Sequence, residues 1–307
     1  MSHIFDALQR SEAERSGVEL DAFDVPTELL QIAESAVKTQ TAVSEQPVTP
    51  SLETPATGSM EGSSAIANSE FEKFESLPVS LSPTGKLVTV TQKDSLAAEK
   101  FRFLAVRLRH MKQRRSLQKL LITSTVPEEG KSTVAANLSC ALGVRKQQRI
   151  LLIEGDLRRP TLQNQFGLGR IPGLADYLDA TVNRPPVYRL EALGIWIIPA
   201  GKPLKNPLEL IQSPRLSSLL EQMAGAFDWI IIDSPPVLPL ADTSIWMRLS
   251  DGILLVTRQG TTDRDQLKSG LEAIEPSKLL GALVNSSSHA THSDYYQHYG
   301  AAVTPAA

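Results

Sequence analysis

The chain has 307 residues, enough for one or two domains, and 41% of them are hydrophobic, which suffices for a sizeable core. No apolar run approaches the ~20 residues of a membrane-spanning helix, and the first residues have neither the basic nor the apolar region of a secretory signal. The formal net charge of -3 gives no reason to expect nucleic-acid binding, and the single cysteine, Cys140, excludes an intramolecular disulfide. We therefore expect a cytoplasmic protein that binds no nucleic acid.

Residues 1–85 are predicted to form an N-terminal extension. Residues 39–69 are mostly Ser, Thr, Pro, Glu, Ala and Gly with few large apolar side chains, so this stretch is expected to be a disordered linker. Two short helical patterns precede it, near residues 2–16 and 29–33. Each is either a frayed tail or a docking helix that folds on a partner.

A helix is predicted over residues 94–115, with Ser95 as its N-cap. The later part of this helix is basic and contains Arg102, Arg107, Arg109, Lys112, Arg114 and Arg115. Such a run is either a solvated face or a surface that meets acidic groups or lipid head groups.

Short apolar runs then alternate with helical patterns. Each run is continuous and rich in Ile, Leu and Val, as expected of parallel strands that are buried on both faces. The predicted strands are residues 120–124, 150–153, 195–198, 229–232, 253–256 and 280–284. The alternation predicts an α/β domain over residues 86–290, built on a doubly wound, mostly parallel sheet, followed by a flexible tyrosine-containing tail at 291–307.

The strand at 120–124 leads into a loop that ends in Gly-Lys-Ser-Thr and then into a helical stretch. This is the order of a P-loop, whose backbone N–H groups cradle phosphate oxygens. Lys131 would reach the β- and γ-phosphates, and the Ser132 hydroxyl would bind Mg²⁺. Thr125 stands where the simple pattern has Gly. The predicted nucleotide-binding residues are Glu129, Gly130, Lys131, Ser132 and Thr133.

Acidic residues end two further predicted strands. Asp233 closes the run at 229–232, which is the Walker B arrangement for holding Mg²⁺ beside a P-loop. Glu154 and Asp156 follow the run at 150–153 and are themselves followed by two arginines. This second group could orient a nucleophile and stabilise phosphoryl charge, or it could be a loop with local carboxylate–arginine pairing.

Together these elements resemble the bacterial tyrosine kinases of exopolysaccharide and capsule export, the BY-kinases. That family has a P-loop, an apolar run followed by Asp-x-Asp-Leu-Arg-x-Pro, a Walker B strand and a C-terminal tyrosine cluster. All four occur here in order, and the resemblance covers roughly residues 91–300.

The sequence departs from the family pattern at three positions. Glu154 replaces the first Asp of the second motif, and Glu128 stands where the P-loop commonly has Gly. In the family's Glu-x-x-Arg-x-x-Arg oligomerisation helix, Glu99 and Arg102 match but Ala105 replaces the last arginine. We therefore expect weak ring-shaped self-association. The resemblance is to the split type, which works with a separate membrane activator.

The resemblance implies ATP and Mg²⁺ as cofactors, with Ser132, Asp156 and Asp233 near the metal. Lys131, Glu154, Asp156 and Asp233 would be catalytic, and Glu154 would take the place of the base that accepts the tyrosyl proton.

The implied acceptors are Tyr295, Tyr296 and Tyr299, in a neighbouring molecule. The implied function is ATP-dependent tyrosine autophosphorylation that regulates exopolysaccharide or capsule polymerisation and export. The implied partner is a membrane-bound activator of the chain-length-determinant type, which would hold the protein at the cytoplasmic face of the inner membrane.

Two other readings stay open. A nucleotide-switch ATPase of the ParA/MinD type has the same fold, but it carries a second lysine early in the loop, where this chain has Val126. A catalytically impaired family member acting as a scaffold is motivated by Glu154 and Ala105.

Overall fold

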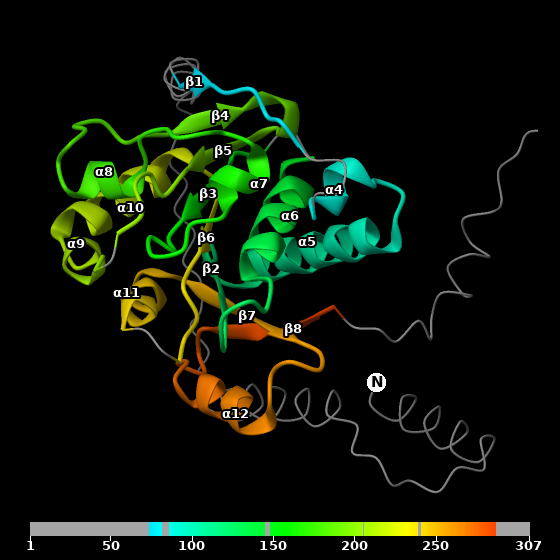
Figure 1. Ribbon diagram of the computed structural model, residues 1–307. Helices are drawn as coiled ribbons and strands as arrows, with labels where there is room; N and C mark the ends of the chain where they lie inside the picture. The colour runs from blue at the N-terminus through cyan, green and yellow to red at the C-terminus, as the bar shows by residue number, and fades with distance from the viewer. Residues whose placement is uncertain (1–73, 82–85, 145–147, 205, 239–240, 287–307) are drawn as a thin grey trace, which may run out of the picture. The chain divides into compact units, whose positions relative to one another are not determined.

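The computed structural model describes residues 74–81, 86–144, 148–204, 206–238 and 241–286 (Figure 1). The predicted helical patterns and linker of the N-terminal extension lie outside the described residues, as do the three tyrosines predicted to accept phosphate.

The described part of the chain contains an eight-stranded sheet in the order β1-β4-β5-β3-β6-β2-β7-β8. Neighbouring strands are parallel except for the antiparallel pair β4–β5. The strands are β1 (Glu75–Ser76), β2 (Lys119–Ser124), β3 (Ile150–Glu154), β4 (Tyr188–Leu190), β5 (Ile195–Ile198), β6 (Trp229–Asp233), β7 (Gly252–Arg258) and β8 (Leu279–Asn285). The predicted fold class and all six predicted strands are confirmed.

Two strands escaped prediction because they are too short to show an apolar run. β1 falls within the predicted extension, yet it pairs with β4. The next residue is also hydrogen-bonded to β4, because Leu77 N–H donates to Arg189 O at 2.9 Å. The folded region therefore begins before the expected boundary at residue 86.

The central strands of the sheet are buried from solvent on both faces. Every residue of β3 and β6 is buried, and so are all of β2 except Lys119 and all of β7 except Arg258. Continuous Ile, Leu and Val runs suit this environment because helices cover both faces of the sheet.

Helices connect the strands and lie on both sides of the sheet. They are α4 (Val88–Thr91), α5 (Leu96–Arg114), α6 (Lys131–Gly143), α7 (Leu162–Phe166), α8 (Leu174–Leu178), α9 (Leu208–Ile211), α10 (Pro214–Ala226), α11 (Asp242–Leu249) and α12 (Arg264–Glu272). Figure 1 shows α6 between α5 and the central strands, with α10 and α11 on the other side. Since α6 is covered from both sides, nearly all of its residues are buried.

The basic half of α5 is partly structural. Arg109 donates to Leu142 O at 3.0 Å, and Arg115 donates to Asp251 O at 2.9 Å. Lys112 donates to Asp228 O. These three basic side chains bind α5 to backbone carbonyl groups elsewhere in the protein. At least half of the six basic residues named in this helix therefore already have hydrogen-bond acceptors within the protein.

Ala105 faces the core, with 0% of its surface exposed. Glu99 and Arg102 form an exposed ion pair on the same helix. With 3.6 residues per turn, each step of three residues rotates the side chain by about 60°, which turns position 105 inward. An arginine there would have to enter the core. The predicted weak self-association stays a prediction.

Candidate active site

The P-loop connects β2 to α6 and contains two residues with left-handed backbone conformation. Gly130 has φ +92°, and a Cβ atom there would lie 2.1 Å from Asn285 Nδ2, so both the dihedral angle and the space require glycine. Glu128 has φ 66°, which is strained for a residue with a side chain. This is the position where the resembling family commonly has Gly.

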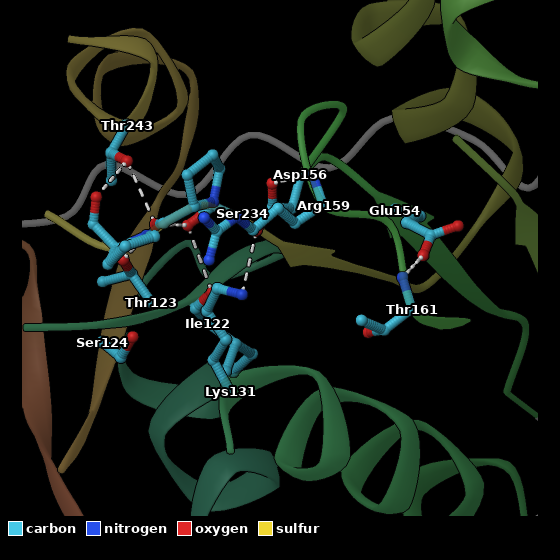
Figure 2. Close-up of polar contacts among 12 residues, drawn as sticks. Ile122, Thr123, Ser124, Lys131, Glu154, Asp156, Arg159, Thr161, Ser234 and Thr243 are labelled. Atoms are coloured by element: carbon cyan, nitrogen blue, oxygen red, sulfur yellow. Dashed lines mark hydrogen bonds and ion pairs between the residues drawn. The ribbon is translucent and has the colours of Figure 1, made fainter. Parts of the chain in front are cut away.

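Lys131 and Asp156 meet at the start of α6 (Figure 2). Lys131 Nζ lies 3.0 Å from Asp156 Oδ2, and both side chains are largely enclosed. Burial lowers the pKa of Lys131, but the carboxylates of Asp233 and Asp156 outweigh it, so that its pKa is raised and the ammonium group stays charged. The second oxygen, Asp156 Oδ1, accepts the Arg159 N–H at 3.0 Å. A fixed cation therefore stands at the P-loop.

Asp233 ends β6 with its side chain completely buried. Within the described residues neither of its carboxylate oxygens accepts a hydrogen bond of ordinary geometry, although the Ser132 hydroxyl lies beside them. Burial raises its pKa to about 7, although Lys131 and the hydroxyl of Ser132 lower it. A buried carboxylate without partners is costly unless something else binds to it.

The turn after β6 is held in place by hydroxyl groups. Ser234 donates from both N and Oγ to Ile122 O, at 3.1 and 3.2 Å. Thr123 and Thr243 both donate to Pro235 O, at 2.8 and 3.0 Å. These bonds tie the end of β6 to β2 and α11, so Asp233 has a fixed position beside the P-loop.

The donors around Asp233 suit magnesium. A carboxylate and a hydroxyl are hard oxygen ligands, and Mg²⁺ binds through one or two carboxylates together with water and substrate phosphates. Within the ranges that the structure describes, no cluster of three or more His, Cys, Asp or Glu residues could hold a metal on its own. A carboxylate beside a hydroxyl fits a Mg²⁺ ion that shares its coordination with the phosphates of a nucleotide.

Glu154 does not join this group. Its Oε1 accepts the N–H groups of Thr161 and Leu162 at 2.6 and 2.5 Å, and its Oε2 accepts the N–H of Ala200 at 3.0 Å. Burial raises its pKa, and these three bonds partly oppose the rise. Figure 2 shows its carboxylate joined to Thr161 rather than to Lys131. This geometry supports an anchoring role, and the role of Glu154 as the base stays a prediction.

The two arginines after β3 include Arg158, whose side chain reaches α11. Arg158 makes a bidentate pair with Asp242 at the start of α11, with Nε–Oδ2 at 2.6 Å and Nη2–Oδ1 at 3.1 Å. Between Glu154 and Asp156, Gly155 is packed so closely that a Cβ atom would lie 2.9 Å from both Asp233 O and the Trp246 ring.

The structure thus brings together Lys131, Ser132, Asp156 and Asp233, and Glu154 lies next to them on β3 with its carboxylate bound to backbone N–H groups. Thr133 continues α6 next to this group, and the side chain of Glu129 is fully buried. Sequence reasoning missed Asp242 and Thr262, because a polar residue at the start of a helix or in a turn gives no sign of its distant partner.

Comparisons with known proteins identify relatives of the chain. No family model matches the chain. The chain is 33% identical over 212 residues to the tyrosine-protein kinase YwqD of Bacillus subtilis, which covers 68% of this chain and 89% of that protein. It is 33% identical over 182 residues to the tyrosine-protein kinase CpsD of Streptococcus agalactiae, covering 57% and 79%. A match to the tyrosine-protein kinase ptk of Acinetobacter johnsonii, 32% identical over 202 residues, spans 65% of this chain but only 27% of that protein.

Solved structures give the same result. The kinase domain of Escherichia coli tyrosine kinase ETK superposes with a TM-score of 0.60 at 27% identity, over 66% of this chain and 82% of that one. The chimerical protein CapA2B2 superposes with a TM-score of 0.62 at 27% identity, over 73% and 98%. Among the described helices, none has the length and apolar character needed to cross a membrane. The fold, the P-loop site and these relatives together show that the chain belongs to the bacterial tyrosine-protein kinases.

Proposed function

We propose that this kinase transfers the γ-phosphoryl group of Mg²⁺-ATP to Tyr295, Tyr296 and Tyr299 of a second copy of the same protein. This autophosphorylation would regulate the polymerisation and export of a capsule or exopolysaccharide. The observation that carries the proposal is Asp233, a fully buried carboxylate that accepts no hydrogen bond of ordinary geometry within the described residues and lies beside a P-loop lysine and serine. Family membership favours the kinase over the nucleotide-switch alternative.

Nucleotide binding is proposed to use the loop and the start of α6. Backbone N–H groups there favour phosphate oxygens, and Lys131 would leave Asp156 to neutralise the β- and γ-phosphates. Ser132 and Asp233 would hold Mg²⁺, which, when bound, neutralises charge on the transferred phosphoryl group. Positioning and charge neutralisation account for most of the catalysis in such a site.

Asp156 is the better candidate for the base. Once Lys131 turns to the phosphates, Asp156 Oδ2 is free to accept the proton of a tyrosine hydroxyl, while the N–H of Arg159 still holds the other oxygen. The tyrosine oxygen then bonds to the γ-phosphorus as the bond to the β-phosphate oxygen breaks. Because Glu154 is bound to the backbone, its departure from the family pattern does not remove the base and gives the impaired-scaffold alternative no support.

We place the enzyme at the cytoplasmic face of the inner membrane, recruited by a membrane-bound activator of the chain-length-determinant type. This part of the proposal rests on the resemblance to the split type of the family. The activator would raise the local concentration of kinase molecules, which favours phosphorylation of one molecule by another.

The test uses the full-length chain with Mg²⁺-ATP and mass spectrometry of the C-terminal peptide. We expect phosphate on the three tyrosines, and its loss in Lys131→Met because the phosphates lose their fixed cation. Lys268→Met on the exposed face of α12 is the matched control and should keep full activity. Phosphotyrosine formed at an unchanged rate by Lys131→Met would contradict the proposed site.

A further inference from the structure

Glu129 belongs to the P-loop, but its side chain has a role that the mechanism above does not use. The carboxylate is fully buried. Its Oε2 accepts the N–H of Val126 at 2.8 Å, which closes the loop on itself, and its Oε1 accepts the hydroxyl of Thr262. The P-loop is thereby fastened to the connection between β7 and α12, which is more than a hundred residues away in the chain.

The polarity of this contact follows from the neighbours of Thr262. Its Oγ1 accepts a hydrogen bond from Thr257 Oγ1 at 2.9 Å and another from Arg258 N at 3.2 Å. With both acceptor positions filled, the hydroxyl has one proton to donate, which points to Glu129 Oε1 or to the more distant Arg258 O at 3.3 Å.

The main chain of Glu129 is held from a second direction. Asn285, the last residue of β8, donates from Nδ2 to Glu129 O at 2.9 Å. Its Oδ1 accepts Ser286 N–H at 2.9 Å, which fixes the orientation of the amide. Asn285 can approach this closely because Gly130 has no Cβ atom. The β7–α12 connection thus binds the side chain of Glu129, and the end of β8 binds its main chain.

We propose that Thr262 and Asn285 are positioning residues that hold the P-loop in its phosphate-binding shape before the nucleotide arrives. When the loop is already ordered, nucleotide binding does not have to supply the entropy cost of ordering it. The hydrogen bonds from Thr262 and Asn285 to Glu129 should therefore increase the affinity for nucleotide. The proposed chemical step depends on Lys131, Asp156 and Asp233, and Thr262 and Asn285 form their hydrogen bonds with Glu129 instead. The inference rests on the proposed nucleotide site, and it predicts an effect on binding and KM rather than on kcat.

The experiment measures the Kd of the full-length chain for Mg²⁺-ADP by calorimetry. Thr262→Val keeps the shape but removes the hydroxyl, and we expect a Kd about tenfold weaker, the size expected for one net hydrogen bond. Thr262→Ser restores the hydroxyl and should bind like the original protein. Thr261→Val, at the exposed adjacent threonine, is the matched control and should leave Kd unchanged. In kinase assays KM for ATP should rise in parallel with Kd, with kcat within about twofold.

A second variant covers the possibility that Thr262→Val does not fold. Asn285→Asp places a carboxylate oxygen against the carbonyl of Glu129 and should weaken Mg²⁺-ADP binding in the same way. Unchanged Kd in either folded variant, or a loss of kcat at saturating ATP, overturns the inference. A lower melting temperature with unchanged Kd shows a structural role only and also overturns it. If the original protein itself does not bind Mg²⁺-ADP, the proposed nucleotide site fails first.

Discussion

Two buried carboxylates lie opposite each other on neighbouring strands and have opposite surroundings. Glu154 of β3 is in register with Asp233 of β6, and both side chains are fully enclosed. Glu154 accepts hydrogen bonds from three backbone N–H groups, whereas Asp233 accepts none of ordinary geometry among the residues that the structure describes. Burial alone therefore does not show which carboxylate has a hydrogen-bonding capacity left for a ligand. The satisfied group stabilises the fold, and the unsatisfied group marks where a ligand is needed.

The largest expected effect is on activity, from Asp233→Asn. Removal of the charge that would hold Mg²⁺ should lower the phosphotransfer rate by about 10²-fold or more. The fold should keep or gain stability, because a buried carboxylate without well-formed hydrogen bonds is removed. Single-turnover rates and melting temperatures measure the two effects. A variant that is unfolded would show that Asp233 is structural and would break the comparison.

Glu154→Gln should have the reverse pattern. The amide NH₂ cannot accept the backbone N–H groups that the carboxylate accepts, so we expect a loss of about 1–3 kcal/mol in unfolding free energy. The phosphotransfer rate of the folded fraction should stay within a few-fold of the original. Denaturant unfolding and single-turnover kinetics separate the two quantities. A rate lowered 10²-fold with unchanged stability would restore Glu154 as the base.

The pH dependence of stability separates the two carboxylates further. Asp233 has a pKa of about 7 when folded and near 4 when unfolded, so between these values the folded protein binds more protons. Its contribution to stability should therefore fall as pH rises from 4 to 7. Melting temperatures measured without Mg²⁺ should fall over this range, and Asp233→Asn should reduce the slope. Because Glu154 remains in both proteins, equal slopes would mean that Asp233 is ionised throughout.

The smallest effect is expected at Glu128, another departure from the family pattern. Glu128→Gly removes left-handed strain of about 1 kcal/mol, so the melting temperature should rise slightly while activity stays within about twofold. Ala180→Gly, at φ 64° and outside the P-loop, is the matched control and should stabilise by a similar amount. If activity changes in Glu128→Gly alone, the departure affects function as well as stability.

Much of the site could be predicted from local sequence. The P-loop, Lys131, Ser132 and Asp233 lie on or directly after strands whose apolar runs are continuous in the sequence. Parallel strands align their carboxyl ends at one edge of the sheet, so the end of each predicted strand already places its polar residues near the others. The six long strands and the doubly wound fold follow from the same local pattern.

Other features were decided only by tertiary structure. β1 and β4 exist because strand partners are available, not because their few residues favour strands. The partner of a polar side chain is equally nonlocal. The carboxylate of Glu154 is bound by N–H groups of two later segments, and that of Glu129 by a hydroxyl on the β7–α12 connection. The sequence alone determined which side chains are candidates for binding or catalysis. Long-range hydrogen bonding, which only the tertiary structure decides, determined which of these side chains already have partners within the protein.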